Sequence, residues 1–244
     1  MSKQFIKKIS GRSKKYSQNF LTIKSVTDSK PEGLTVEEAV KLILSLDKPN
    51  FKEGPSAELH ASLNIDSTKS DQLVRSSAIL PHGTGKTIRV AAFVTPDKEK
   101  EAKDAGADII GGEELVEKIK QDQKINFDKA VAVPEMMKKL PSIARILGVA
   151  GVMPNPKTGT VGENIAEIIK TIKAGKIDYK NDKTGNVHLV FGKINSKFDE
   201  QKLIQNLNTA IESIQKSKPE VIKKKFIKSL SISTSNSPSI KIKL

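Results

Sequence analysis

The chain has 244 residues, which is enough for one or two domains with apolar cores of their own. Cysteine is absent and the three histidines are scattered, so disulfides and thiol nucleophiles are excluded, and no metal site or cofactor is expected. The chain carries 42 Lys and Arg against 28 Asp and Glu, a net charge of +14, which predicts a polyanionic partner, nucleic acid first. No stretch reaches the roughly 18 apolar residues of a membrane helix, so we expect no membrane partner.

The positive charge is concentrated at the two ends of the chain. Residues 1–82 have a net charge of +4, residues 83–175 of +2 and residues 176–244 of +8. If the two ends fold together, they form one basic body beside a nearly neutral one. Of the 42 bases 38 are lysine, which favours phosphate contacts over base recognition by arginine. The alternative is that the lysines serve solubility alone.

The first elements are predicted from capping and periodicity. Residues 1–30 are basic and without a clear period, and we expect a partly mobile arm. Thr35 and Glu38 have the spacing of a capping box, followed by apolar residues at helical spacing, which predicts a helix over 36–46. Residues 57–65 alternate apolar and polar, the pattern of a strand with one buried face, and His60 falls on the polar face.

The middle of the chain alternates between strands and helices, which predicts a parallel sheet. The expected strands are 88–94, 107–110 and 127–133. The expected helices are 97–105, 113–120 and 134–147. Residues 151–159 are too rich in Pro and Gly for either element and predict a loop or hinge.

The last third has a different pattern. The expected helices are 163–173 and 199–216, and the expected strands are 186–194, 226–234 and 239–244. The order of elements and the charge distribution together predict a discontinuous α+β domain from both chain ends, with an inserted α/β domain built on a parallel sheet. We expect the first domain at 1–82 plus 176–244, the second at 83–175, and hinges near 76–84 and 157–176.

The segment Gly83–Thr87 contains Gly-Lys-Thr, the end of a phosphate-binding loop, but it lacks the rest of that motif. Leu80 occupies the place of the first glycine, and the β-rich residues 88–94 follow where a helix is needed. Paired catalytic carboxylates and a Ser-His-Asp set are equally unsupported. We therefore expect no enzyme, with nucleotide hydrolysis as the weakest of the alternatives.

Phe51 and His188 are further candidate site residues, and Phe51 has two interpretations. Phe51, in a turn beside Lys52, either fills the core or stacks on RNA next to a phosphate-binding lysine. His188 is expected near the polar surface of a strand in the most basic third of the chain.

Several motifs follow one another along the chain: Ile65-Asp66, Lys69-Ser70-Asp71-Gln72, Val74-Arg75, Leu80-Pro81-His82-Gly83-Thr84-Gly85, Ala105-Gly106-Ala107-Asp108, Met153–Val161 and Asn181-Asp182-Lys183-Thr184-Gly185 with His188. In this order they resemble the bacterial-type family of large-subunit ribosomal protein one, the universal protein of the ribosomal stalk at the exit site. They extend over nearly the whole chain.

The resemblance implies a non-enzymatic constituent of the large ribosomal subunit. In that family, the domain made by both chain ends binds the mobile stalk of the large-subunit rRNA, and the middle domain is Rossmann-like. The implied partners are the rRNA stalk, the exit-site tRNA, whose release the family assists, and the protein's own mRNA, which it represses. The implied location is the cytoplasmic ribosome, and the sequence leaves an organellar ribosome open.

The family's RNA contacts can be carried over residue by residue. They fall on Phe51, Lys52, Glu58, Lys180, Asn181, Lys183, His188, Lys193, Thr234, Ser235, Asn236 and Ser237. This chain departs from the family where members usually have Thr-Met-Gly and it has Ser235-Asn236-Ser237, and where Val149 and Ala150 replace Pro-Arg. The altered loop motivates one alternative function, an extra-ribosomal regulator that binds mRNA.

Overall fold

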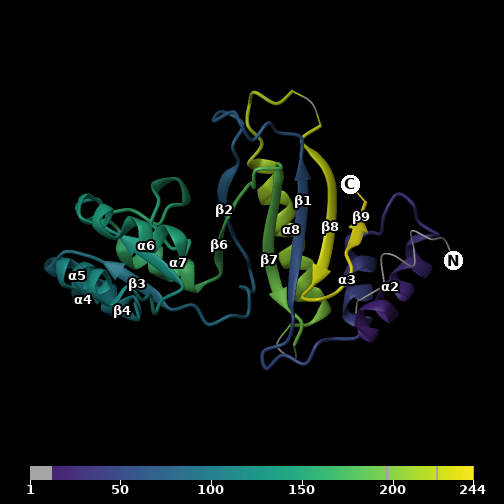
Figure 1. Cartoon of the computed structure of the whole chain (residues 1–244), viewed down its shortest axis with the longest axis horizontal. Helices are drawn as coiled ribbons and strands as arrows, with labels where there is room; N and C mark the ends of the chain where they lie inside the picture. Colours follow the sequence, from purple (N-terminus) through teal and green to yellow (C-terminus); the bar gives the residue numbers. More distant parts are fainter. Residues whose placement is uncertain (1–12, 196–197, 224, 244) are drawn as a thin grey trace. The chain divides into compact units, whose positions relative to one another are not determined.

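The computed structural model describes residues 13–195, 198–223 and 225–243, in two compact units (Figure 1). The first unit consists of the chain up to Gly85 and from Tyr179 onward, and the second is Lys86–Asp178. The chain therefore passes from one unit to the other twice.

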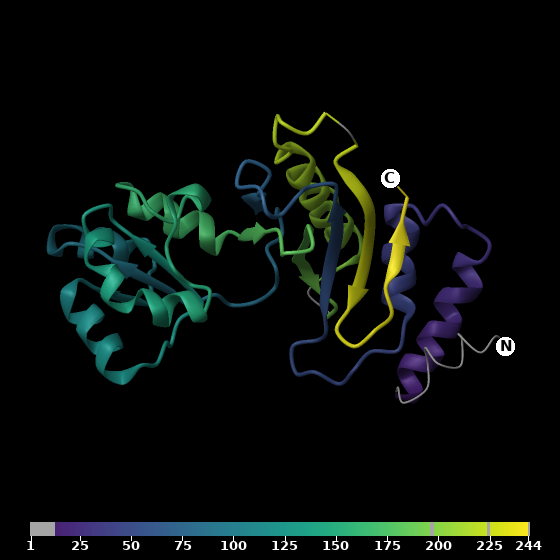
Figure 2. The same ribbon diagram turned by 45° about the horizontal axis from the view of Figure 1, so that its top comes forward.

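An antiparallel sheet forms the centre of the first unit (Figure 2). Its strands, in the order β7-β1-β8-β9, are β7 (Asn186–Lys193), β1 (Ser56–Leu63), β8 (Ile227–Thr234) and β9 (Ile240–Ile242). Every second residue of β1 is buried, from Ala57 to Leu63, as the alternation predicts. One face of the sheet is therefore apolar and the other polar.

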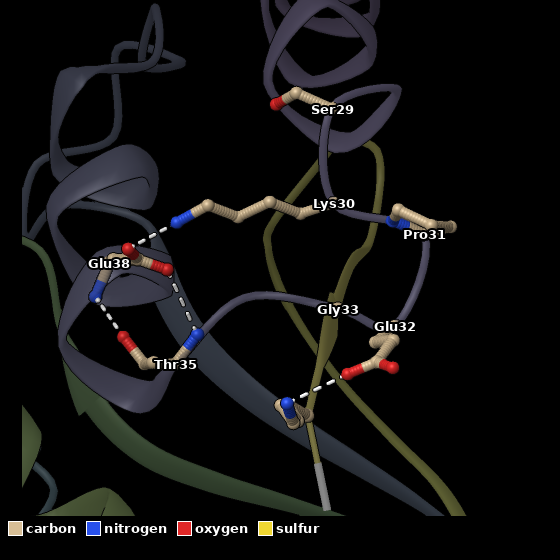
Figure 3. Close-up of a pocket in the computed structure, with 8 residues that line it drawn as sticks. Ser29, Lys30, Pro31, Glu32, Gly33, Thr35 and Glu38 are labelled. Atoms are coloured by element: carbon tan, nitrogen blue, oxygen red, sulfur yellow. Dashed lines mark hydrogen bonds and ion pairs between the residues drawn. The ribbon is translucent and has the colours of Figure 1, made fainter.

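The apolar face packs against the helices α3 (Val36–Ser45) and α8 (Glu200–Lys216). The predicted capping box begins α3: the Thr35 hydroxyl accepts from the N–H of Glu38, and the Glu38 carboxylate accepts from the N–H of Thr35. Just before it, Leu34 pairs with Ile242 and so extends the sheet beyond β9. The segment before α3 and the start of that helix line a pocket of about 420 Å³. Figure 3 shows that Lys30 binds the carboxylate of Glu38 in this pocket.

The N-terminal segment differs from the expected arm over part of its length. Residues 14–27 form a helix, α2 (Lys14–Thr27), whose N-cap is Ser13, while residues 1–12 lie outside the described residues. The helix buries only Asn19 and Ile23, so it carries almost no apolar stripe that a sequence pattern would detect. The prediction of a mobile arm is therefore wrong for α2.

The second unit is a three-layer α/β fold. Its strands β3 (Val90–Phe93), β4 (Ile109–Gly111) and β5 (Lys129–Ala132) form a parallel sheet in the order β4-β3-β5. Helices α4 (Glu99–Asp104) and α7 (Ile165–Lys173) contribute to the core on one face of the sheet. The core on the other face includes residues of α5 (Glu113–Asp122) and α6 (Ala144–Val149). The predicted parallel sheet of an α/β fold is confirmed.

Some elements differ from the prediction, and proline explains part of the difference. The expected helix over 134–147 consists instead of two 3₁₀ turns, η2 (Met136–Lys138) and η3 (Leu140–Ile143), ahead of α6. Pro141 lacks the N–H that a continuous helix would use. Two further 3₁₀ turns, η1 (Pro96–Lys98) and η4 (Pro156–Thr158), begin at prolines.

Two strands were not predicted from the periodicity of the sequence. These are β2 (Arg75–Ile79) and β6 (Lys176–Lys180), which form a two-stranded sheet of their own. The burial of β2 does not alternate, so its sequence lacks the period of a half-buried strand.

Candidate nucleic-acid interface

The polar face of the four-stranded sheet, called here the open face, gathers side chains from three strands. Its residues are exposed or half-buried, while their neighbours along each strand are mostly buried under α3 and α8. They are Glu58, His60 and Ser62 on β1, Asn186, His188 and Val190 on β7, and Ser229, Ser231 and Ser233 on β8. The antiparallel register places His60 directly between His188 and Ser231.

Histidine rings meet at the centre of the open face. Nδ1 of His60 lies 2.8 Å from Nδ1 of His188, and the other ring nitrogen of His60 lies 2.9 Å from the Ser233 hydroxyl. The two rings are edge to face, with centroids 5.0 Å apart. Burial of the ring and the facing His188 lower the pKa of His60 below its usual value, against an opposing influence from Glu58.

The turn between β6 and β7 lies at one end of the open face. The carboxylate of Asp182 accepts from the N–H groups of Thr184 and Asn186, each within 2.8 Å, and lies 3.6 Å from Nε2 of His188. Hydrogen bonds from Asn186 and then Thr184 lower the pKa of Asp182 to about 2, so this carboxylate is ionised at neutral pH. The hydrogen bonds of the turn therefore hold an ionised carboxylate beside the ring of His188.

Three predicted contact residues belong to this turn. Lys180 and Lys183 are exposed, as phosphate contacts require. Asn181 is held in place, because its Oδ1 accepts from the N–H of Val74 at 2.8 Å and its own N–H donates to the Val74 carbonyl.

Other predicted residues lie at the opposite end of the open face, where β1 begins. Phe51 is 47% exposed and Lys52 is exposed, so the interpretation of Phe51 as a core residue is wrong. Lys193 forms an ion pair with Glu53, and its side chain is only 12% exposed. Among these three, Phe51 and Lys52 are accessible to a ligand.

The loop Thr234–Ser237 closes the same end and is tied to β1. The N–H of Ser235 donates to the Ser56 carbonyl, and the Ser56 N–H donates to the Ser235 hydroxyl. Asn236 is exposed and has φ of +63°, whereas Ser237, at the place of the family's glycine, has no positive φ. Serine at that position therefore introduces no backbone strain. Thr234 is buried and belongs to the loop through its backbone.

The structure thus brings the predicted residues to one sheet but separates them into two groups. Seven residues of β1, from Ser56 to Ser62, lie between the groups, which corresponds to about 20 Å along the strand. Glu58 and His188 occupy the face between them. The prediction missed His60, Ser231 and Ser233 as site residues: the alternation along β1 had placed His60 on the polar face, but only the strand register places it between His188 and Ser231.

Enzymatic features do not accompany this surface. Strand β3, and no helix, follows Gly83–Thr87, so the segment lacks the context of a phosphate-binding loop. The described residues contain no group of three or more His, Asp or Glu side chains suited to a metal ion. Within the same part of the chain, no helix is both long and apolar enough to cross a bilayer.

Comparison with known proteins gives consistent matches. Residues 23–238 match the model of the ribosomal protein L1p/L10e family. The chain is 42% identical over 230 residues to large ribosomal subunit protein uL1 of Fervidobacterium nodosum, covering 94% of this chain and 96% of that protein. It is 41% identical to the protein of that name from Thermosipho africanus and 42% identical to that from Kosmotoga olearia, each over 228 residues, 93% of this chain and 96% of the relative.

Proposed function

The chain belongs to the ribosomal protein L1p/L10e family, whose members are ribosomal components and not enzymes, and from this membership we propose that its open face binds the stalk of large-subunit rRNA. The protein then acts as a constituent of the large ribosomal subunit. Relatives are named as proteins of that subunit, which supports this assignment.

One observation carries the proposal: the open face is polar, half-exposed and bordered by exposed lysines at both ends. Lys52 lies at one end, and Lys180 and Lys183 at the other. Lysines can contact the RNA backbone, while the hydroxyls and imidazoles between them can bond to phosphates and 2′-hydroxyls. Phe51 offers a ring on which a base can stack.

The discontinuous arrangement is part of the same proposal. The basic RNA-binding domain comprises both ends of the chain, and the inserted Rossmann-like domain assists movement and release of deacylated tRNA from the exit site. The division of the chain at Gly85 and Tyr179 supports this arrangement. Because only two segments connect the units, we expect the inserted domain to move as a rigid body.

The same surface provides a route to translational repression. An mRNA segment that folds like the stalk would present the same phosphates and 2′-hydroxyls to the open face. We therefore include binding to the protein's own mRNA among the proposed activities.

The test is the affinity of the full chain for a stalk RNA fragment and for a scrambled RNA of equal length, measured over a salt series. We expect a preference for the stalk that persists at high salt, because purely electrostatic binding ignores sequence and weakens steeply with salt. Equal, salt-labile binding of both RNAs would contradict stalk recognition. Co-sedimentation with large subunits then separates a ribosomal constituent from an extra-ribosomal regulator of mRNA.

A further inference from the structure

The strongest feature that the family comparison leaves unexplained is a chain of polar contacts across the open face, in which two hydrogen bonds join His188, His60 and Ser233 and a charged contact of 3.6 Å joins Asp182 to His188. It connects Asp182 in the turn before β7, His188 on β7, His60 on β1 and Ser233 on β8. Four consecutive polar groups thus span three strands, and the two imidazoles lie in the middle. The name relay is used below for these four residues.

The partners of each ring select one arrangement of protons when both imidazoles are neutral. Two facing Nδ1 atoms need one donor and one acceptor. Because the ionised Asp182 lies 3.6 Å from Nε2 of His188, that nitrogen carries the hydrogen of His188 and its Nδ1 is the acceptor. Nδ1 of His60 then donates to His188, and Nε2 of His60 accepts from the Ser233 hydroxyl at 2.9 Å.

One added proton exchanges the donor and acceptor roles in the two hydrogen bonds of His60, with His188 and with Ser233, and breaks neither bond. When Nε2 of His60 gains a proton, its Nδ1 proton can pass to His188, which becomes an imidazolium beside Asp182. Nε2 of His60 then donates to the Ser233 oxygen, and the Ser233 hydroxyl rotates so that its hydrogen, still bonded to the oxygen, points away from His60. A second proton would place two N–H groups face to face across 2.8 Å and would break the central bond.

We propose that the relay couples RNA binding to the uptake of one proton at the centre of the open face. The protonated relay presents a positive charge and a free hydroxyl donor from Ser233, and both favour an RNA phosphate. A bound phosphate therefore favours the protonated form, and by linkage the protonated form binds RNA more tightly. This inference rests on the proposed RNA-binding function of the open face.

Charged groups of both signs surround the relay. On β1, Glu58 lies 3.9 Å from Nε2 of His60 and favours its protonation. On β7, the facing groups are His188 itself and, from the preceding turn, Asp182. Strand β8 contributes Ser231 and Ser233, which do not titrate, and β9 places Lys241 opposite Ser231.

The experiment measures the affinity of the full chain for the stalk RNA fragment between pH 6.0 and 8.0 at constant salt. We expect the wild-type protein to bind about three- to tenfold more weakly at pH 8.0, because the uptake of one proton changes affinity by at most tenfold per pH unit. His60→Gln, which keeps hydrogen-bonding groups but does not titrate, should show less than about a twofold change over the same range.

The third histidine provides the matched control. His82 lies outside the open face, beside Gln205 of α8. His82→Gln should therefore retain the wild-type pH dependence. An equal pH dependence in wild type, His60→Gln and His82→Gln would overturn the proposal.

A second measurement tests the relay without RNA. NMR of the full chain with ¹⁵N-labelled histidine should show His188 as the Nε2–H form and His60 as the Nδ1–H form at pH 8.0. Two Nε2–H tautomers would overturn the relay, whatever the RNA affinity. Absence of stalk binding at every pH, with the expected tautomers present, would instead contradict the proposed function and leave the relay intact.

Discussion

Asn19 in α2 and Asp47, just after α3, exchange two hydrogen bonds through one side-chain amide. Nδ2 of Asn19 donates to the Asp47 carbonyl, and the Asp47 N–H donates to Oδ1 of Asn19, both at 2.9 Å. Asn19 is 4% exposed. The Asn19 side chain thus serves as the hydrogen-bond partner of the Asp47 backbone, where the chain leaves α3. These two bonds hold α2 to the segment that follows α3.

Replacing Asn19 by alanine should lower the free energy of unfolding of the first unit by about 1–3 kcal/mol, because two partly buried backbone groups lose their partners. Both tyrosines of the chain, Tyr16 and Tyr179, belong to this unit, so tyrosine fluorescence in a urea titration reports its unfolding. Gln18→Ala, at an exposed position of the same helix, is the control. Equal midpoints for the two variants would contradict the role of Asn19.

The β6–β7 turn should make stability depend on pH at the acidic end. The pKa of Asp182 is lowered to about 2 in the folded protein, so its ionised form contributes stability that is present above the unfolded pKa of about 4 and is lost as pH falls toward 2. Asp182→Asn should therefore be less stable than wild type at pH 7. The difference should shrink between pH 4 and pH 2 in urea titrations, and Asp71→Asn, at an exposed site, should show neither effect. A difference independent of pH would be inconsistent with this origin.

Phe51 should matter for RNA binding and little for folding. With 47% of its surface exposed, its replacement by alanine removes few core contacts. If a base stacks on the ring, Phe51→Ala weakens binding of the stalk RNA fragment by about 1–3 kcal/mol. Leu21→Ala, at a residue 45% exposed on α2, is the matched control for loss of exposed apolar surface. Affinities that are the same in both variants would remove Phe51 from the interface.

Two lysines of the site should differ in their effect on salt dependence. Lys183 is exposed, so Lys183→Gln should reduce the slope of log affinity against log salt by about 0.7–0.9, the value for one phosphate contact. Lys193 is already neutralised by Glu53, so Lys193→Gln should leave the slope unchanged. Lys100→Gln in the second unit sets the baseline. An unchanged slope for Lys183→Gln together with a reduced slope for Lys193→Gln would contradict this prediction. It would show that RNA displaces Glu53 from Lys193.

Periodicity predicted most of the fold because most elements bury one regular face. The capping box before α3, the alternation along β1 and the apolar face of α8 each identify an element within two or three residues. The exceptions are elements held by other means. Helix α2 is fixed by the amide of Asn19, and β2 and β6 pair mainly with each other, so neither leaves a periodic apolar pattern.

The candidate site was only partly predictable for a related reason. The resemblance identified His188, but it says nothing of its partner, because the contact depends on the register between β1 and β7. That register was visible only in three dimensions, as was the ion pair that occupies Lys193. Exposed residues in turns, such as Lys183, were easier to predict because a turn remains accessible in any arrangement of the strands.

The topology of the four-stranded sheet also has a consequence for synthesis of the protein. Strand β1 emerges from a translating ribosome well before β7 and β8, yet both of its neighbours in the sheet come from the last sixty residues. The second unit, by contrast, is a continuous segment, Lys86–Asp178, that is complete before β7 is made. Since domains generally fold as units during synthesis, the inserted unit should acquire its structure first, while β1 waits for its neighbours. Strand β1, although it is made before the whole second unit, is therefore among the last elements to find its place in a sheet.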